Sequence, residues 1–174
     1  AIGTVLLPDL SRRLRAGDMQ GGRDSFNRGT EFALALTLPA AIALMVIALP
    51  LTSVLYQRGA FGPDDTAATA LVLAIYGAGL PSFVLHKTLQ PLFYAREDAR
   101  SPFRYAVNSM VVNLVIAVGL MPWIGFAAAA LATTVAGWTM AAQLWFGARK
   151  LGEVARFDDR FRNRTARIVV ASLV

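Results

Sequence analysis

The sequence predicts an all-α fold, a polytopic transmembrane helix bundle, and three observations support this prediction. Of the 174 residues, 56% are hydrophobic and 16% are charged, whereas about a quarter of the residues in average soluble domains are charged. Apolar stretches of about twenty residues recur along the chain, and a helix needs this length to cross the hydrocarbon of a bilayer. Basic residues are concentrated in alternate segments between these stretches, as they are in membrane proteins.

Four stretches predict complete spans and two predict truncated ones, so we expect a single partial membrane domain within a larger protein. The spans are expected at residues 1–7 (truncated), 32–55, 67–94, 105–121, 126–147 and 167–174 (truncated). Pro39 and Pro50 lack a backbone N–H and predict a kink or opening in the first complete span. The sequence YGAGLP at residues 76–81 predicts a bend in the second.

Local patterns predict where helices start and how closely they pack. Asp64 and Asp65 follow Pro63, and carboxylates there favour the positive end of a helix dipole. Ala128, Ala132 and Ala136 repeat every four residues, which predicts a small-residue face that lets a neighbouring helix approach closely.

The distribution of positive charge predicts the orientation. Lysine and arginine number five, one, four, none and seven in successive connecting segments. The positive-inside rule then places segments 8–31, 86–104 and 148–167 in the cytoplasm. Segment 8–31 is expected to be a solvated loop with a short interfacial helix around residues 10–16. The net charge of +6 does not predict a nucleic-acid partner, because the basic residues lie between apolar spans.

The residues that enzymes use are scarce in this chain. There is one histidine, His86, and no cysteine. The sequence holds no HExxH motif and no GxxxxGK[ST] loop, so it predicts neither a zinc hydrolase nor an ATP-driven transporter.

Three polar residues in the third and fourth complete spans form a candidate site. Ser109 and Asn113 are four residues apart and share one helical face, and Thr133 lies on the next span. One interpretation is interhelical hydrogen bonding, which is common in membrane bundles. The other is a polar site for a coupling cation such as sodium, made of neutral oxygens. Thr133 and Thr134 are expected to bond to their own helix backbone, and the alternative is that they face Asn113 across the turn.

Three motifs carry a resemblance to a known family. The sequences LLPDLSRRL, LYQRGAF and LQPLFYAREDARSP resemble the MurJ/MviN family of lipid II flippases, in the superfamily of multidrug, oligosaccharidyl-lipid and polysaccharide exporters. The resemblance implies fourteen transmembrane helices in two lobes. This chain would supply the end of helix eight, helices nine to twelve and the beginning of helix thirteen.

The resemblance also implies a function, which is transport and not enzymatic catalysis. Such a protein moves lipid II, the lipid-linked precursor of cell-wall peptidoglycan, between the leaflets of the bacterial inner membrane by alternating access. Its partners would be this lipid-linked oligosaccharide, membrane lipids and the remaining helices of its own chain. No cofactor is implied beyond a coupling cation (sodium) or the membrane potential.

Lys87 is the candidate phosphate contact, because it lies within the end of a span and matches a basic position of the family motif. The alternative for Lys87 is snorkelling to the cytoplasmic headgroups. The alternatives for the function are export of another polyprenyl-linked glycan or of drugs, and a non-transporting membrane scaffold.

Overall fold

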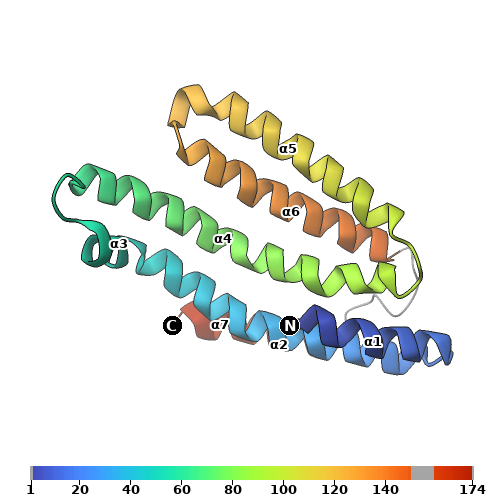
Figure 1. Ribbon diagram of the computed structural model, residues 1–174. Helices are drawn as coiled ribbons and strands as arrows, with labels where there is room; N and C mark the ends of the chain where they lie inside the picture. The colour runs from blue at the N-terminus through green and yellow to red at the C-terminus, as the bar shows by residue number, and fades with distance from the viewer. Residues whose placement is uncertain (1, 150–158, 174) are drawn as a thin grey trace.

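The structure is a computed structural model that describes residues 2–149 and 159–173, and this part of the chain contains seven helices (Figure 1). They are α1 (Ile2–Arg15), α2 (Met19–Val46), α3 (Ala48–Tyr56), α4 (Pro63–Tyr94), α5 (Arg100–Ile124), α6 (Ala127–Arg149) and α7 (Asp159–Leu173). No strand occurs among the described residues, so the predicted all-α class is confirmed.

Three of the helices in the described part of the chain, α2, α4 and α5, are long and apolar enough to cross a membrane. They cover most of the predicted spans 32–55, 67–94 and 105–121. The span predicted at 126–147 is also a helix, α6, but its threonines, tryptophans and glutamine make it less apolar. The predicted truncated spans 1–7 and 167–174 fall within α1 and α7, except for residues 1 and 174, which lie outside the described residues.

The predicted opening near Pro50 is present. Helix α2 ends at Val46 and α3 begins at Ala48, with Ile47 between them. Pro50 has no N–H to donate to the carbonyl of Val46, four residues earlier, so the helical ladder is interrupted at this point. Pro39, in contrast, lies inside α2. Residues 76–81, where a bend was predicted, do not interrupt the helix, because α4 continues through Pro81 as one helix.

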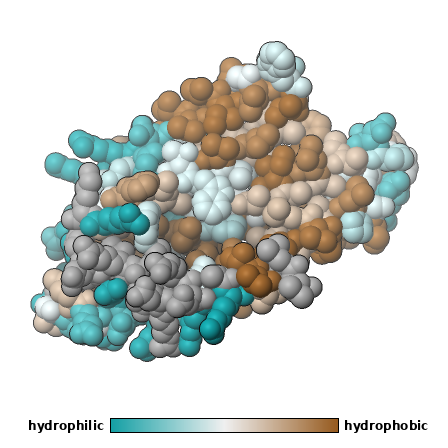
Figure 2. All heavy atoms as spheres, turned by 180° about the vertical axis from the view of Figure 1, so that it is seen from behind, coloured by the Kyte–Doolittle hydropathy of each residue, from teal (hydrophilic) through white to brown (hydrophobic). Residues whose placement is uncertain are grey.

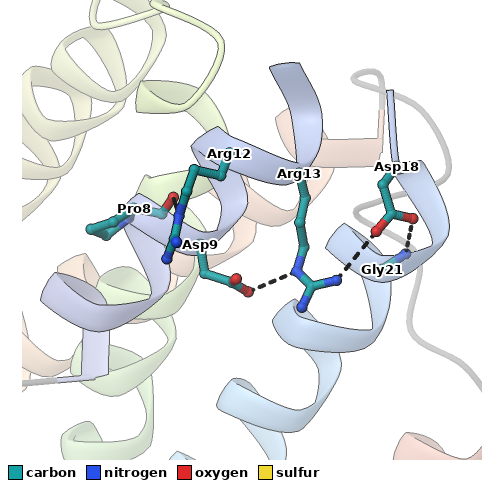
Figure 3. Close-up of polar contacts among 6 residues, drawn as sticks. All are labelled: Pro8, Asp9, Arg12, Arg13, Asp18 and Gly21. Atoms are coloured by element: carbon teal, nitrogen blue, oxygen red, sulfur yellow. Dashed lines mark hydrogen bonds and ion pairs between the residues drawn. The ribbon is translucent and has the colours of Figure 1, made fainter. Parts of the chain in front are cut away.

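The prediction that residues 8–31 form a loop is wrong. Most of this segment is helical, and α1 and α2 are separated only by a turn at residues 16–18. The Asp18 carboxylate accepts a hydrogen bond of 2.8 Å from the N–H of Gly21 at the start of α2. Arg13 bridges to Asp9 at 3.0 Å and to Asp18 at 3.2 Å, which ties the two helices at the turn (Figure 3).

Packing explains why glycines did not break the helix here. Leu10 of α1 and Phe26 of α2 are both fully buried, and both belong to the core where these helices meet α4. Burying two large apolar side chains contributes more than the roughly 1 kcal/mol that each helical glycine costs. The expected short interfacial helix is therefore part of a longer one.

The predicted cytoplasmic segments 86–104 and 148–167 also contain more helix than the sequence predicted. Between α4 and α5 only residues 95–99 are non-helical, and α7 already begins at Asp159. Residues 150–158 lie outside the described residues. Within α7, Arg164 forms an ion pair of 2.8 Å with Glu31 of α2, whose side chain is 15% exposed. This pair anchors α7 on α2.

The helices pack in a row in the order α5, α6, α4 and α2, with α1 and α7 against α2 (Figure 1). The largest buried side chains, among them Phe26, Leu89, Phe93 and Leu144, gather where α4 turns into α5. In Figure 2 apolar side chains cover the middle of the face turned away in Figure 1, and hydrophilic ones lie towards its ends. This banding matches a bundle that crosses a membrane.

Candidate functional site

Lys87 lies on the exposed side of α4, next to the buried Thr88 and Leu89. No salt bridge between described residues involves its ammonium group. Lys87 therefore keeps its three donors available to a group outside this part of the chain. This geometry agrees with a phosphate contact and with snorkelling to headgroups alike.

Ser109, Asn113 and Thr133 come together between α5 and α6. The Ser109 hydroxyl donates to the carbonyl of Ala136 at 2.6 Å, and the Asn113 amide donates to the Thr133 hydroxyl at 3.2 Å. Thr133 in turn donates to the carbonyl of Ala129 at 2.8 Å. The interhelical hydrogen bonds that the sequence predicted are thus present.

The same contacts leave one oxygen available. Because Thr133 donates its proton to its own helix, it can only accept from Asn113, which fixes the orientation of the Asn113 amide. The amide oxygen of Asn113 then has no hydrogen bond to another described residue. In the described part of the chain, no group of three or more His, Cys, Asp or Glu residues could hold a metal ion. A cation here would meet neutral oxygens.

The α4–α6 interface holds polar contacts that sequence reasoning missed. His86 Nε2 lies 2.6 Å from the carbonyl oxygen of Gly137. Since a carbonyl only accepts, Nε2 is the protonated nitrogen of the ring. Thr134 donates to the carbonyl of Ile75 at 3.0 Å, and Trp138 donates to that of Ala78 at 3.2 Å. The expectation that Thr134 bonds within its own helix is therefore wrong.

Small residues bring these helices close together. A Cβ atom on Gly137 would meet Ser82 Oγ at 2.6 Å, and one on Gly79 would meet Thr134 Oγ1 at 3.0 Å. Ala128, Ala132 and Ala136 are at most 5% exposed, as their four-residue spacing predicted. Close backbone approach is what allows side-chain donors of one helix to reach carbonyls of the other.

The turn between α4 and α5 lies within FYAREDARSP, residues 93–102, which is the most specific part of the family resemblance. Asp98 accepts hydrogen bonds from the N–H groups of Arg100 and Ser101, at 3.1 and 3.0 Å, and from the Ser101 hydroxyl at 2.6 Å. These bonds, the one from the Ser101 hydroxyl first, hold the pKa of Asp98 below its ordinary value. Glu97 has a positive φ of 62°, which is uncommon for a residue other than glycine. The motif is therefore a tight structural turn.

The corner between α1 and α2 is stabilised in a similar way (Figure 3). A hydrogen bond from Ser25, followed by that from Arg13, lowers the pKa of Asp9, and partial burial opposes them. Both polar corners lie at the same end of the bundle, where α1 meets α2 and α4 meets α5 (Figure 1). Arg58, the basic residue of the segment between α3 and α4, lies at the opposite end.

Comparison with known proteins agrees with this arrangement. The profile of the family described as "Lipid II flippase MurJ" matches residues 1–174, which is the whole chain. The chain belongs to the lipid II flippase MurJ family. The MurJ family is one of transporters, so the expectation that this chain is not an enzyme agrees with its family.

Individual members of the MurJ family show how much of a whole protein the chain represents. It is 44% identical to "Probable lipid II flippase MurJ" of Rhizobium tropici and 42% identical to that of Rhizobium meliloti (strain 1021), in each case over 100% of this chain and 32% of the relative. The chain thus spans about a third of the length of these curated relatives. A solved structure, "Lipid II flippase MurJ, inward closed conformation", has the same fold, with a TM-score of 0.81 and 24% identity over 99% of this chain and 34% of that one.

Proposed function

We propose that this chain is part of a flippase that moves lipid II from the inner to the outer leaflet of the bacterial inner membrane by alternating access. The observation that carries this proposal is the family match over all 174 residues. A diphosphate headgroup cannot cross hydrocarbon unaided, because burying an unpaired charge is very costly. A polar cavity between two lobes replaces its water, and rocking of the lobes exposes that cavity to each side in turn.

The membrane topology is part of the same proposal. Helix α6 serves as the fourth complete span, because it packs between α4 and α5, and α1 and α7 belong to two further spans. The segments around the turns 16–18 and 95–99 and the end of α6 face the cytoplasm. Support comes from the arginines in these segments, because the segments lie at one end of the bundle (Figure 1) and positive charge is concentrated on the cytoplasmic side of membrane proteins.

The proposal is tested by depleting the full-length protein in its own bacterium and locating lipid II. We expect the precursor to accumulate on the inner leaflet and growth to stop, and expression of the full-length protein to restore both. Normal lipid II translocation in depleted cells would reject the proposal. It would favour export of another polyprenyl-linked glycan or of drugs, or a scaffold role.

We propose Lys87 as a substrate contact, because it is exposed and has no ion-pair partner among the described residues. Replacement by alanine in the full-length protein is expected to lower transport about tenfold or more, since a hydrogen bond to a charged group contributes roughly 1.5–3 kcal/mol. Lys87→Arg, which keeps the charge, should retain most of the activity. The measurement is complementation of a depletion strain together with lipid II translocation. Wild-type growth of the alanine variant at normal expression would reject this role.

We also propose that Ser109, Asn113 and Thr133 contribute neutral oxygens to a sodium site that couples transport. The support is the Asn113 amide oxygen without a hydrogen bond to a described residue. Replacing Asn113 by aspartate adds a carboxylate, so sodium should stabilise that variant more than the wild type, whereas Asn113→Leu should abolish the sodium effect.

The sodium effect is measured as the difference in melting temperature between sodium chloride and choline chloride, on the full-length protein. If sodium stabilises all three proteins equally, or none of them, the site is rejected. That result would favour the membrane potential as the energy source.

A further inference from the structure

The end of the bundle opposite the polar corners contains an apolar cavity between α3 and α4. Its volume is about 430 Å³, within the range of sites that hold small molecules. The lining residues come from α3, the turn after it and the first half of α4. They are Leu51, Thr52, Leu55, Tyr56, Phe61, Thr69, Val72, Leu73 and Tyr76.

The chemistry of this lining favours hydrocarbon. No lining residue is charged, and the buried Thr52 hydroxyl already donates to the carbonyl of Ala48 at 2.7 Å. Apolar cavities do not retain water, because water finds no hydrogen-bond partners in them. An empty cavity of this size would lose packing contacts along its walls.

The depth of the cavity determines what can fill it. Helix α4 has 32 residues, so at roughly 1.5 Å per residue it is about 48 Å long, against about 30 Å for the hydrocarbon of a bilayer. If the excess is shared between its two ends, hydrocarbon begins about 9 Å from Pro63, at the level of Thr69, and Tyr76 lies about 20 Å from Pro63. The wall that α4 contributes therefore lies within the hydrocarbon of one leaflet.

The cavity is continuous with the apolar outer surface. Leu55 and Tyr56 line it and are 49% and 57% exposed, so it opens outward. Val54 and Leu71, beside it on the same two helices, are exposed apolar residues outside the lining. Tyrosines such as Tyr56 are enriched at the boundary between hydrocarbon and headgroups. The opening thus meets lipid chains.

We propose that this cavity binds one hydrocarbon chain of a bilayer phospholipid. Arg58 lies at the headgroup level and uses its Nη2 to bond the carbonyls of Val54 and Leu55, while Asp64 and Asp65 oppose its charge in the same turn region. Recognition therefore depends on the chain and not on an anionic headgroup. The proposal requires a membrane location and does not depend on which lipid the protein transports.

The test uses the full-length protein in nanodiscs of phosphatidylethanolamine and phosphatidylglycerol, with a trace of phosphatidylcholine that carries a diazirine in the middle of one acyl chain. After illumination, the adducts are mapped by mass spectrometry of peptides. We expect them to concentrate on the lining residues of α3 and α4. Even labelling of lining and outer residues, or labelling of outer residues alone, would overturn the proposal.

Two matched substitutions sharpen the test. Thr69→Phe fills the cavity and should reduce adducts on its lining about tenfold, which corresponds to a modest loss of binding free energy. Leu71→Phe introduces the same ring two residues away, outside the lining, and should leave the labelling unchanged. If Thr69→Phe does not fold, as judged by size-exclusion chromatography, Leu73→Trp replaces it. Undiminished labelling in a folded cavity-filling variant would show that the chain is not bound there. Absence of labelling in the wild type would show that another segment of the protein fills the cavity.

Discussion

Helix α4 forms two interfaces that differ in how closely the helices approach. Towards α6 it presents Gly79 and Ser82, and the two backbones come so close that a Cβ atom on Gly137 would meet Ser82 Oγ at 2.6 Å. Towards α3 it presents Val72 and Tyr76, and a cavity of about 430 Å³ remains between the helices. One helix thus combines a closed and an open interface.

The difference follows from side-chain size and hydrogen bonding. At the α4–α6 interface, side chains such as His86 and Thr134 reach carbonyls of the opposite helix. Between α3 and α4, the hydroxyl of Thr52 bonds within its own helix, and no hydrogen bond between described residues joins the two helices. In lipid there is no hydrophobic driving force for helix association. Close packing of small residues and hydrogen bonds between helices stabilise the contact instead. The α4–α6 pair should therefore be rigid, and the α3–α4 pair should adapt to what fills it.

The largest effect is expected from breaking the close approach at Gly137. Replacement by leucine places a side chain where Ser82 Oγ already lies, and overpacking of this kind costs about 1–3 kcal/mol. We expect a lower melting temperature of the full-length protein in detergent, measured by tryptophan fluorescence. The matched control is Gly119→Leu in α5, where nothing lies within 4 Å of the added Cβ. Equal melting temperatures of the two variants would show that the α4–α6 contact is not tight.

A smaller effect is expected from removing one interhelical hydrogen bond. Thr134→Val keeps the shape of the side chain but loses the bond to the Ile75 carbonyl, and such bonds contribute about 0.6 kcal/mol on average and about 1.7 at most. Thr139→Val is the control, because Thr139 bonds only to the carbonyl of Val135 in its own helix. Chemical or thermal unfolding of both variants gives the difference. A larger loss for Thr139→Val than for Thr134→Val would contradict the importance of bonds between helices.

Several features of the two interfaces that α6 forms with α4 and α5 could be predicted from the sequence because they are local or periodic. The four-residue spacing of Ala128, Ala132 and Ala136 is enough to place them on one buried face. The pairing of Asn113 with Thr133 was one of two predicted alternatives, because the two spans are joined by a short turn. A role of Asn113 in cation binding, like that of Lys87 in substrate binding, stays a prediction, since hydrogen bonds alone do not test it.

Other features depend on contacts that are distant in sequence. His86 bonds to Gly137, 51 residues away, and no local pattern marks that partner. The helix through residues 19–31 contains three glycines and polar residues, and it forms because Phe26 is buried in the core. The cavity between α3 and α4 likewise results from the direction that α3 takes after the break at Ile47.

The smallest effect is expected at the turn that joins α4 to α5, and it depends on pH. The folded-state pKa of Asp98 is lowered from its ordinary value of 3.8, chiefly by the Ser101 hydroxyl. A lowered pKa contributes stability that is fully present above the unfolded value and is lost as the pH falls through the folded value. Acidification from about pH 6 to about pH 3 should therefore lower the melting temperature.

Asp98→Asn separates this contribution from that of other carboxylates such as Asp9. Asparagine also caps helices well, so the variant should remain folded near neutral pH and lose less of its stability in acid than the wild type does. Asp64→Asn, at the start of α4, is the control and should follow the wild-type curve. If Asp98→Asn followed the wild-type curve as well, the turn would not limit stability in acid. The interhelical contacts of α4 with α6 would then be sufficient to hold this end of the bundle together.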